Sequence, residues 1–184
     1  MFEILNYEFV QNALIAGILV SIAAGVIGSL VVTNKMVFLA GGIAHSAYGG
    51  IGLSIFFGFS IFFGASVFAI AAAFLMAYLT YDKKTRADTV IGVIWALGMA
   101  LGIVFIDMTP GYNVDLMSYL FGSILAVQKE DLYFMFFLDL AIILVVTVFY
   151  RAFLAISYDM EFSKLRGLPV KFFYFLLLGL TALT

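Results

Sequence analysis

Two long stretches with almost no charge constrain this sequence more than any other feature. Residues 9–34 carry no charged side chain, and residues 36–81 carry only the imidazole of His45. About 20 apolar residues in a helix cross the hydrocarbon core of a bilayer, which is roughly 30 Å thick. The first stretch therefore predicts one membrane-spanning helix. The second is about twice as long and predicts two helices that fold back near Gly58.

Composition supports a membrane protein and excludes several other classes. Hydrophobic residues make up 65% of the 184 residues and charged residues 11%, against roughly 25% charged residues in soluble domains. The net charge of −2 offers no basic field for nucleic acid. The chain has no Cys, so disulfides and thiolate metal sites are excluded. We find no nucleotide-binding loop and no nucleophile placed beside a base, so we expect no enzymatic activity.

Polar and turn-forming segments divide the remainder of the chain. Residues 82–88 form the densest charge cluster, and Pro110 lies in a second turn. We expect continuous helices over 37–58, 61–81, 89–106 and 132–152, and a short re-entrant helix over 115–127. The last apolar run, 172–184, is too short to span a bilayer and predicts that the chain is incomplete at its C-terminal end.

The lysines and arginines indicate an orientation. Cytoplasmic loops of membrane proteins carry an excess of these residues. With the N-terminus outside, six crossings and the re-entrant helix place eight basic residues inside and only Lys129 outside. The eight are Lys35, Lys83, Lys84, Arg86, Arg151, Lys164, Arg166 and Lys171.

Small residues recur every four positions in three of the expected helices. Such stripes let helix backbones approach closely in a bilayer. They predict tight helix packing, and walls for a substrate path are the alternative. The residues are Gly17, Ser21, Gly25 and Ser29 in the first helix, Gly42, Ser46 and Gly50 in the second, and Gly98 and Gly102 in the fourth.

Two polar side chains inside the apolar helices are candidates for contact with a transported cation. His45 is the only histidine, and Asp139 lies between two leucines. Ionisable groups within a bilayer are costly unless they are paired or functional. His45 is either a ligand for an ion such as Zn²⁺ or Mn²⁺ or the donor of an interhelical hydrogen bond. Asp139 either lines a cation path or lies at a hydrated position near the membrane surface.

Residues 157–169 combine charged and apolar side chains with the sequence Gly-Leu-Pro. Gly167 is a typical helix stop, and Pro169 can begin the next helix. The spacing is compatible with an amphipathic docking helix for a partner or with an ordinary solvated loop.

Four segments, in order, resemble the family of ABC permeases that import zinc, manganese or iron(II). Residues 36–47 match a glycine-rich stretch that ends in a histidine, and residues 88–93 match an acidic residue followed by Ile-Gly. Residues 115–125 match D-x-x-x-Y-L-F-G-x-I-L, and residues 157–169 match S-x-D-x-E-F followed by G-L-P. The resemblance implies an all-α membrane bundle, a type II ABC importer-like permease, over residues 1–184.

The resemblance also assigns roles to residues. His45 matches a histidine that meets the metal in transit. Many members have an aspartate one helical turn earlier, where this chain has Gly41, so the choice between zinc and manganese stays open. Residues 157–168 would be the coupling segment that touches an ATP-binding subunit. The assigned contacts are Asp159, Glu161, Phe162, Leu165 and Gly167.

The resemblance further implies a multi-pass protein of a prokaryotic plasma membrane that works as a homodimer by alternating access. Its partners would be a cytoplasmic ATP-binding subunit and an extracellular or periplasmic metal-binding protein. ATP would be hydrolysed by the partner, and the chain itself would bind no cofactor. The alternatives are a permease for a metal chelate or a cobalamin-like ligand, and a secondary cation transporter.

Overall fold

The computed structural model describes residues 7–81, 87–110, 124 and 127–184, and these residues form helices and no strands. The all-α class expected from the sequence is confirmed. The predicted re-entrant helix at 115–127 lies almost entirely outside the described residues. The helices are α1 (Glu8–Thr33), α2 (Val37–Ser46), α3 (Tyr48–Phe57), α4 (Ile61–Thr80), α5 (Ala87–Asp107), α7 (Lys129–Tyr158), α8 (Met160–Leu165) and α9 (Val170–Leu183).

Within the described part of the chain, four helices are long and apolar enough to cross a membrane: α1, α4, α5 and α7. α9 is apolar but shorter. The helix predicted over 132–152 extends further at both ends. At its N-terminal end, a capping box between Gln128 and Asp131 starts α7 early. The count of six crossings stays a prediction.

The single helix predicted over 37–58 is wrong, because the chain is interrupted at Ala47 and forms α2 and α3. Ala47 lies in a turn with φ −54° and ψ −23°. Gly49, Gly50 and Gly52 follow directly, and glycine has a low intrinsic preference for helix. α3 ends at Gly58, which has φ +74°, and the Gly58 amide donates to the Ser54 carbonyl at 2.9 Å.

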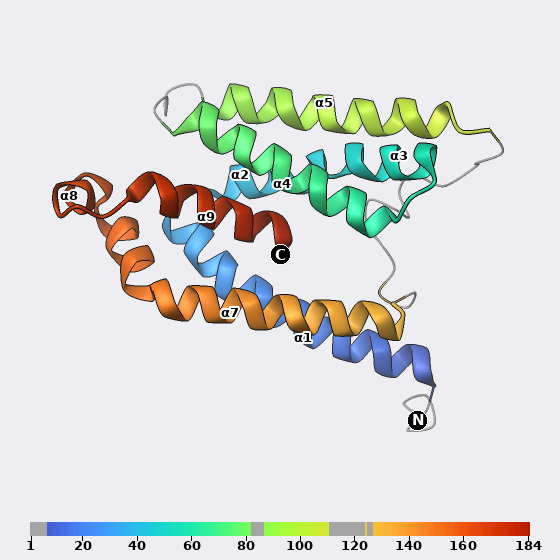
Figure 1. Cartoon of the computed structure of the whole chain (residues 1–184), viewed down its shortest axis with the longest axis horizontal. Helices are drawn as coiled ribbons and strands as arrows, with labels where there is room; N and C mark the ends of the chain where they lie inside the picture. Colours follow the sequence, from blue (N-terminus) through green and yellow to red (C-terminus); the bar gives the residue numbers. More distant parts are fainter. Residues whose placement is uncertain (1–6, 82–86, 111–123, 125–126) are drawn as a thin grey trace.

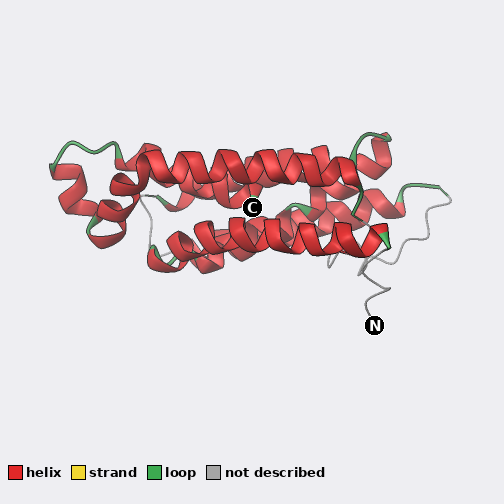
Figure 2. Cartoon of the chain, turned by 90° about the horizontal axis from the view of Figure 1, so that it is seen from below, coloured by secondary structure: helices red, strands yellow, loops and turns green. Residues whose placement is uncertain are grey.

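The helices form two groups with α9 between them (Figure 1). α2, α3, α4 and α5 pack together, and we call them the glycine-packed group. α1 and α7 lie side by side as the α1–α7 pair. In both views the helices run roughly along the long axis of the molecule (Figure 2), and α8 lies at one end (Figure 1). The beginnings of α1 and α7 lie at the other end (Figure 1).

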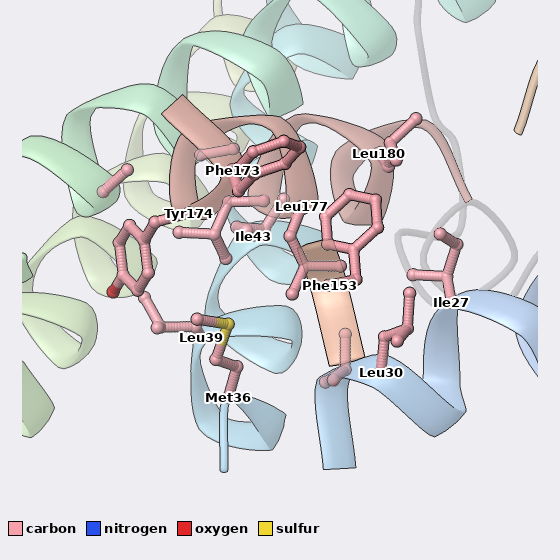
Figure 3. Packing of buried hydrophobic residues seen from close by; sticks show 14 of the residues in the cluster. Ile27, Leu30, Met36, Leu39, Ile43, Phe153, Phe173, Tyr174, Leu177 and Leu180 are labelled. Atoms are coloured by element: carbon pink, nitrogen blue, oxygen red, sulfur yellow. The ribbon is translucent and has the colours of Figure 1, made fainter. Parts of the chain in front are cut away.

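The hydrophobic core is centred on α9. Figure 3 shows Phe173 and Leu177 of α9 among side chains from α1, α2 and α7. Leu178 is fully buried, and Tyr174 shares a hydrogen bond with Thr80 of α4 at 2.9 Å between the two hydroxyl oxygens. α9 therefore contacts both helix groups and joins them into one bundle.

Candidate ion site and partner-binding turn

His45 lies near the end of α2, two residues before the interruption at Ala47, and is half-buried. Its imidazole stacks on the indole of Trp95 in α5, with ring centroids 4.3 Å apart and planes 7° apart. The Nδ1 atom of His45 is buried and has no hydrogen-bond partner among the described residues. The Nδ1 atom therefore does not make the interhelical hydrogen bond considered for His45. The contact between the helices at this residue is the stack of its ring on Trp95.

Close backbone contact between α2 and α5 fixes the position of His45. A Cβ atom added to Gly98 would lie 2.7 Å from the Cα atom of Ser46, so only glycine fits there. The Ser46 hydroxyl donates to the Gly42 carbonyl at 2.6 Å and lies 3.4 Å from the Ile94 carbonyl. Because α2 and α5 meet through these small residues, His45 is held opposite Trp95.

The surroundings of the stacked rings include a thioether and open space. The Trp95 Nε1–H group donates to the Met99 sulfur at 3.0 Å. Among the described residues, a Cβ atom on Gly41 or on Gly92 would meet no atom of a neighbouring element within 4 Å. The sequence interpretation missed Trp95 and Met99. Two signals were available in the sequence. Trp95 is the only tryptophan of the chain, and Met99 follows it four residues later in an apolar helix.

Asp139 lies on α7 and is buried, with 7% of its surface exposed. Its Oδ2 atom has no hydrogen-bond partner within the described ranges. α7 belongs to the α1–α7 pair, whereas His45 faces α5 in the glycine-packed group (Figure 1). Among the described residues, no three or more His, Cys, Asp or Glu side chains gather into a metal cluster. His45 and Asp139 thus stay separate candidates.

A large groove of about 550 Å³ lies between α1 and α7. Its lining is mainly apolar, with Ile15 and Leu19 of α1 facing Phe136 and Phe137 of α7. Neither His45 nor Asp139 lines this groove. Because neither candidate residue lines the groove, its volume is no reason to place the cation there.

α8 is a short helix with a defined structure at both ends. The Asp159 carboxylate accepts a hydrogen bond from the Phe162 amide at 2.9 Å, which caps the N-terminus. Gly167 has φ +79°, and the Leu168 amide donates to the Ser163 carbonyl at 3.1 Å. This is the glycine-dependent arrangement that commonly ends helices. Asp159 and Gly167 therefore shape α8, whatever else they contact.

Large apolar side chains of this turn point away from the protein. Tyr158 is 84% exposed and Leu165 87% exposed, and Phe162 is also exposed. The Arg166 guanidinium lies 5.1 Å from the centre of the Phe162 ring, and Lys164 pairs with Glu161 at 3.2 Å. Apolar side chains thus alternate with charges on an exposed surface at one end of the bundle, the position predicted for a partner contact.

Apolar helices long enough to cross a membrane, with a capped, partly apolar turn at one end, define a multi-pass membrane bundle. The chain belongs to the ABC 3 transport family, which matches residues 6–184. The family resemblance predicted from the four sequence segments is confirmed, as is a multi-pass location in a bacterial membrane.

Individual relatives agree with this assignment. The chain is 50% identical over 184 residues to an uncharacterized membrane protein of Synechocystis sp., covering all of this chain and 66% of that protein. It is 33% identical over 181 residues to a manganese transport system membrane protein of Halalkalibacterium halodurans, covering 98% of this chain and 62% of that protein. The chain therefore spans less than two thirds of the length of these relatives.

A solved structure shares the fold. The structure titled PsaBC from Streptococcus pneumoniae in complex with Fab superposes with a TM-score of 0.78 at 34% identity. The match covers 96% of this chain and 64% of that chain. The helical arrangement described above is therefore that of an ABC transporter membrane protein.

Proposed function

We propose that this chain belongs to the membrane-spanning permease of an ATP-driven importer of a divalent metal ion, zinc or manganese. Family membership supports the importer class. The name of the Halalkalibacterium halodurans relative supports a metal ion as the substrate. The half-buried His45, whose Nδ1 atom has no partner among the described residues, supplies a nitrogen ligand for a divalent metal ion.

The observation that carries this proposal is the exposed turn at α8. Phe162 and Leu165 present apolar surface beside charges on a helix that is capped at both ends. Exposed apolar patches rimmed by polar groups mark contacts with other proteins. In the proposed importer the partner is a cytoplasmic ATP-binding subunit, which hydrolyses ATP while this chain performs no covalent chemistry.

α9 offers a route from this turn to the ion site. α8 is followed directly by α9, which contacts both helix groups. The hydroxyl contact between Tyr174 and Thr80 links α9 to α4. Movement of α8 when the partner binds ATP would be passed through α9 to the helices that hold His45. In a dimer of permeases, this movement would expose the site to the two sides of the membrane in turn.

The substitution Leu165→Ala tests the partner contact. Leu165 is 87% exposed, so its removal leaves the fold intact while deleting part of the proposed interface. We expect binding of the ATP-binding subunit, measured on purified proteins, to weaken about tenfold, a typical loss for an interface side chain. Leu144→Ala is the matched control, because Leu144 is an exposed leucine on α7, far along the helix from α8. Equal binding by both variants would contradict the proposal.

The acidic contacts need variants that spare the helix cap. Reversing the charge of Asp159 would also remove its hydrogen bond to the Phe162 amide. Asp159→Asn keeps a capping side chain and removes only the charge. Glu161→Gln removes the second charge, whose partner Lys164 is solvent-exposed. If ATPase association survives both changes together, charge plays no part in this contact.

His45→Ala tests the substrate. We expect ATP-dependent uptake of Zn²⁺ or Mn²⁺ into proteoliposomes to fall to background, while association with the ATPase is retained. Unchanged uptake of the free ion would remove His45 as a ligand. If the original chain itself took up no free ion, the alternative in which a metal chelate is carried would be favoured.

A further inference from the structure

We infer that Met99 is a second metal-contacting residue beside His45, that Trp95 positions both side chains, and that the site consequently favours Zn²⁺ over Mn²⁺. This inference rests on the proposed function, because it concerns the same ion site. It starts from three side chains on facing helices: His45 on α2, and Trp95 and Met99 on α5.

Trp95 contacts both other side chains, each through a different part of its indole. The face of the ring lies parallel to the imidazole of His45, at 4.3 Å between centroids. The Nε1–H edge donates to the Met99 sulfur at 3.0 Å. The imidazole and the thioether are therefore held next to one aromatic group, one over its face and the other at its edge.

Both candidate ligand atoms can offer a lone pair, His45 Nδ1 when the imidazole proton is on Nε2. The indole N–H can only donate, so the sulfur of Met99 is the acceptor in their contact. A thioether sulfur has two lone pairs, and this contact uses one of them. The Nδ1 atom of His45 is buried without a hydrogen-bond partner in the part of the chain that the structure describes. A buried nitrogen of this kind is costly unless something else binds it.

Space for an ion exists on the same faces of the two helices. Gly41 lies one helical turn before His45, and Gly92 lies one turn before Trp95. A Cβ atom on either glycine would meet no other described part of the protein within 4 Å. His45, Trp95 and Met99 are all half-buried, so part of each side chain is exposed. An ion that keeps water ligands fits such an open, partly buried surface.

The chemistry of the donors indicates the preferred ion. Imidazole and thioether ligands suit Zn²⁺ and softer ions, whereas Mn²⁺ is suited by carboxylates, carbonyls and water. Within the described ranges, no cluster of three or more His, Cys, Asp or Glu side chains is present. The position one turn before His45, from which a carboxylate could share an ion, is occupied by Gly41. A site with nitrogen and sulfur donors and no carboxylate therefore favours zinc.

The chain suits a direct spectroscopic test because it contains no Cys. A sulfur atom bound to Zn²⁺ in the purified chain must then come from methionine. We would load the chain in detergent micelles with Zn²⁺ and record zinc X-ray absorption. We expect a sulfur scatterer at about 2.3 Å, by analogy with zinc–thiolate distances. It should disappear in Met99→Leu and persist in Met135→Leu, which changes a half-buried methionine of α7.

Affinity supplies a second readout. Trp95 is the only tryptophan, so its fluorescence reports on this site alone. We expect Met99→Leu to weaken Zn²⁺ binding about tenfold or more and to leave Mn²⁺ binding nearly unchanged. The positioning role is tested by Trp95→Phe, which keeps a stacking ring and removes the N–H group. We expect it to weaken Zn²⁺ binding in equilibrium dialysis by a similar factor, as loss of a group that orients a ligand does.

The outcomes separate this inference from the proposed function. Suppose that the original chain binds Zn²⁺ and that His45→Ala abolishes this binding. If Met99→Leu then changes neither the Zn²⁺ affinity nor the sulfur signal, the inference about Met99 is wrong and the proposed function stands. If His45→Ala has no effect on binding or on uptake, the proposed ion site itself is wrong. Thermal unfolding of each purified variant identifies any that has lost its fold. If Met99→Leu has lost its fold, Met99→Ile, which also retains an apolar side chain, replaces it.

Discussion

The glycine-packed group and the α1–α7 pair are built from similar sequences but packed in opposite ways. In the glycine-packed group, a Cβ atom on Gly49 would lie 2.9 Å from the Gly98 carbonyl oxygen, so the backbones themselves are in contact. On α1, among the described residues, a Cβ atom on Gly25 or Gly28 would meet nothing within 4 Å, and a Cβ atom on Gly17 would meet a side-chain atom of Ile124 at 3.7 Å. In the described part of the chain, the small-residue stripe of α1 therefore has no close backbone neighbour.

Polar contacts near the helix ends join the α1–α7 pair instead. The Asn12 side-chain amide donates to the Val127 carbonyl at 3.2 Å near one end. The Asn34 side-chain amide donates to the Ser157 hydroxyl at 2.7 Å at the other end. Backbone contact along its length makes the glycine-packed group a rigid unit. The α1–α7 pair, which has polar contacts toward both ends, also carries the large groove, lined by residues from the first half of α1 and of α7.

The largest expected effect on the free energy of unfolding comes from replacing one glycine by alanine in each region, which adds one methyl group. Gly98→Ala would place a Cβ atom 2.7 Å from the Cα atom of Ser46 and push α5 away from α2. We expect it to lower the free energy of unfolding by about 3 kcal/mol, the upper range for overpacking a core. Gly25→Ala adds the same group to open space, and should raise this free energy by about 0.5–1 kcal/mol because alanine favours helix.

Chemical unfolding of the purified variants in mixed micelles measures both changes. Both variants carry the same Gly→Ala substitution within a helix. The comparison therefore depends on the opposite signs of the two changes in the free energy of unfolding. If Gly25→Ala destabilised the chain as much as Gly98→Ala, the stripe on α1 would also be in close contact. The distinction between the two regions would then fail.

An intermediate effect is expected at the end contacts of the α1–α7 pair. Asn34 donates to Ser157 and also to the Leu30 carbonyl at 2.8 Å, so it both ends α1 and attaches it to α7. Asn34→Ala should lower the free energy of unfolding by about 1 kcal/mol, the usual net value of a neutral hydrogen bond. Combining it with Ser157→Ala in a double-mutant cycle isolates the contact between the helices. Additive single effects would show that the two helices are not joined there.

The sequence predicted the features that depend on local chemistry. Long apolar stretches identified α1, α4, α5 and α7, and Gly167 indicated where the short helix α8 ends. It could not distinguish the stripe of α1 from that of α2, because spacing shows which residues share a face and not which helix covers it. Trp95 was missed for the same reason, since its stack on His45 joins residues far apart in the chain. The contacts of α3 with α4 and α5, directly after the interruption at Ala47, likewise join residues that are distant in the sequence.

The smallest effect is expected from the ion pair at the start of the α1–α7 pair. Lys129 Nζ lies 2.9 Å from the Glu8 carboxylate, but the two side chains are 61% and 67% exposed. Water and salt screen such pairs, and most contribute little to stability. We expect Glu8→Gln to leave the melting temperature unchanged within the scatter of replicate measurements, at low and at high salt. A clear, salt-sensitive drop would mean that this end of the pair is held by charge. Attachment of α1 to α7 would then depend on the ion pair as much as on the hydrogen bonds of Asn12 and Asn34.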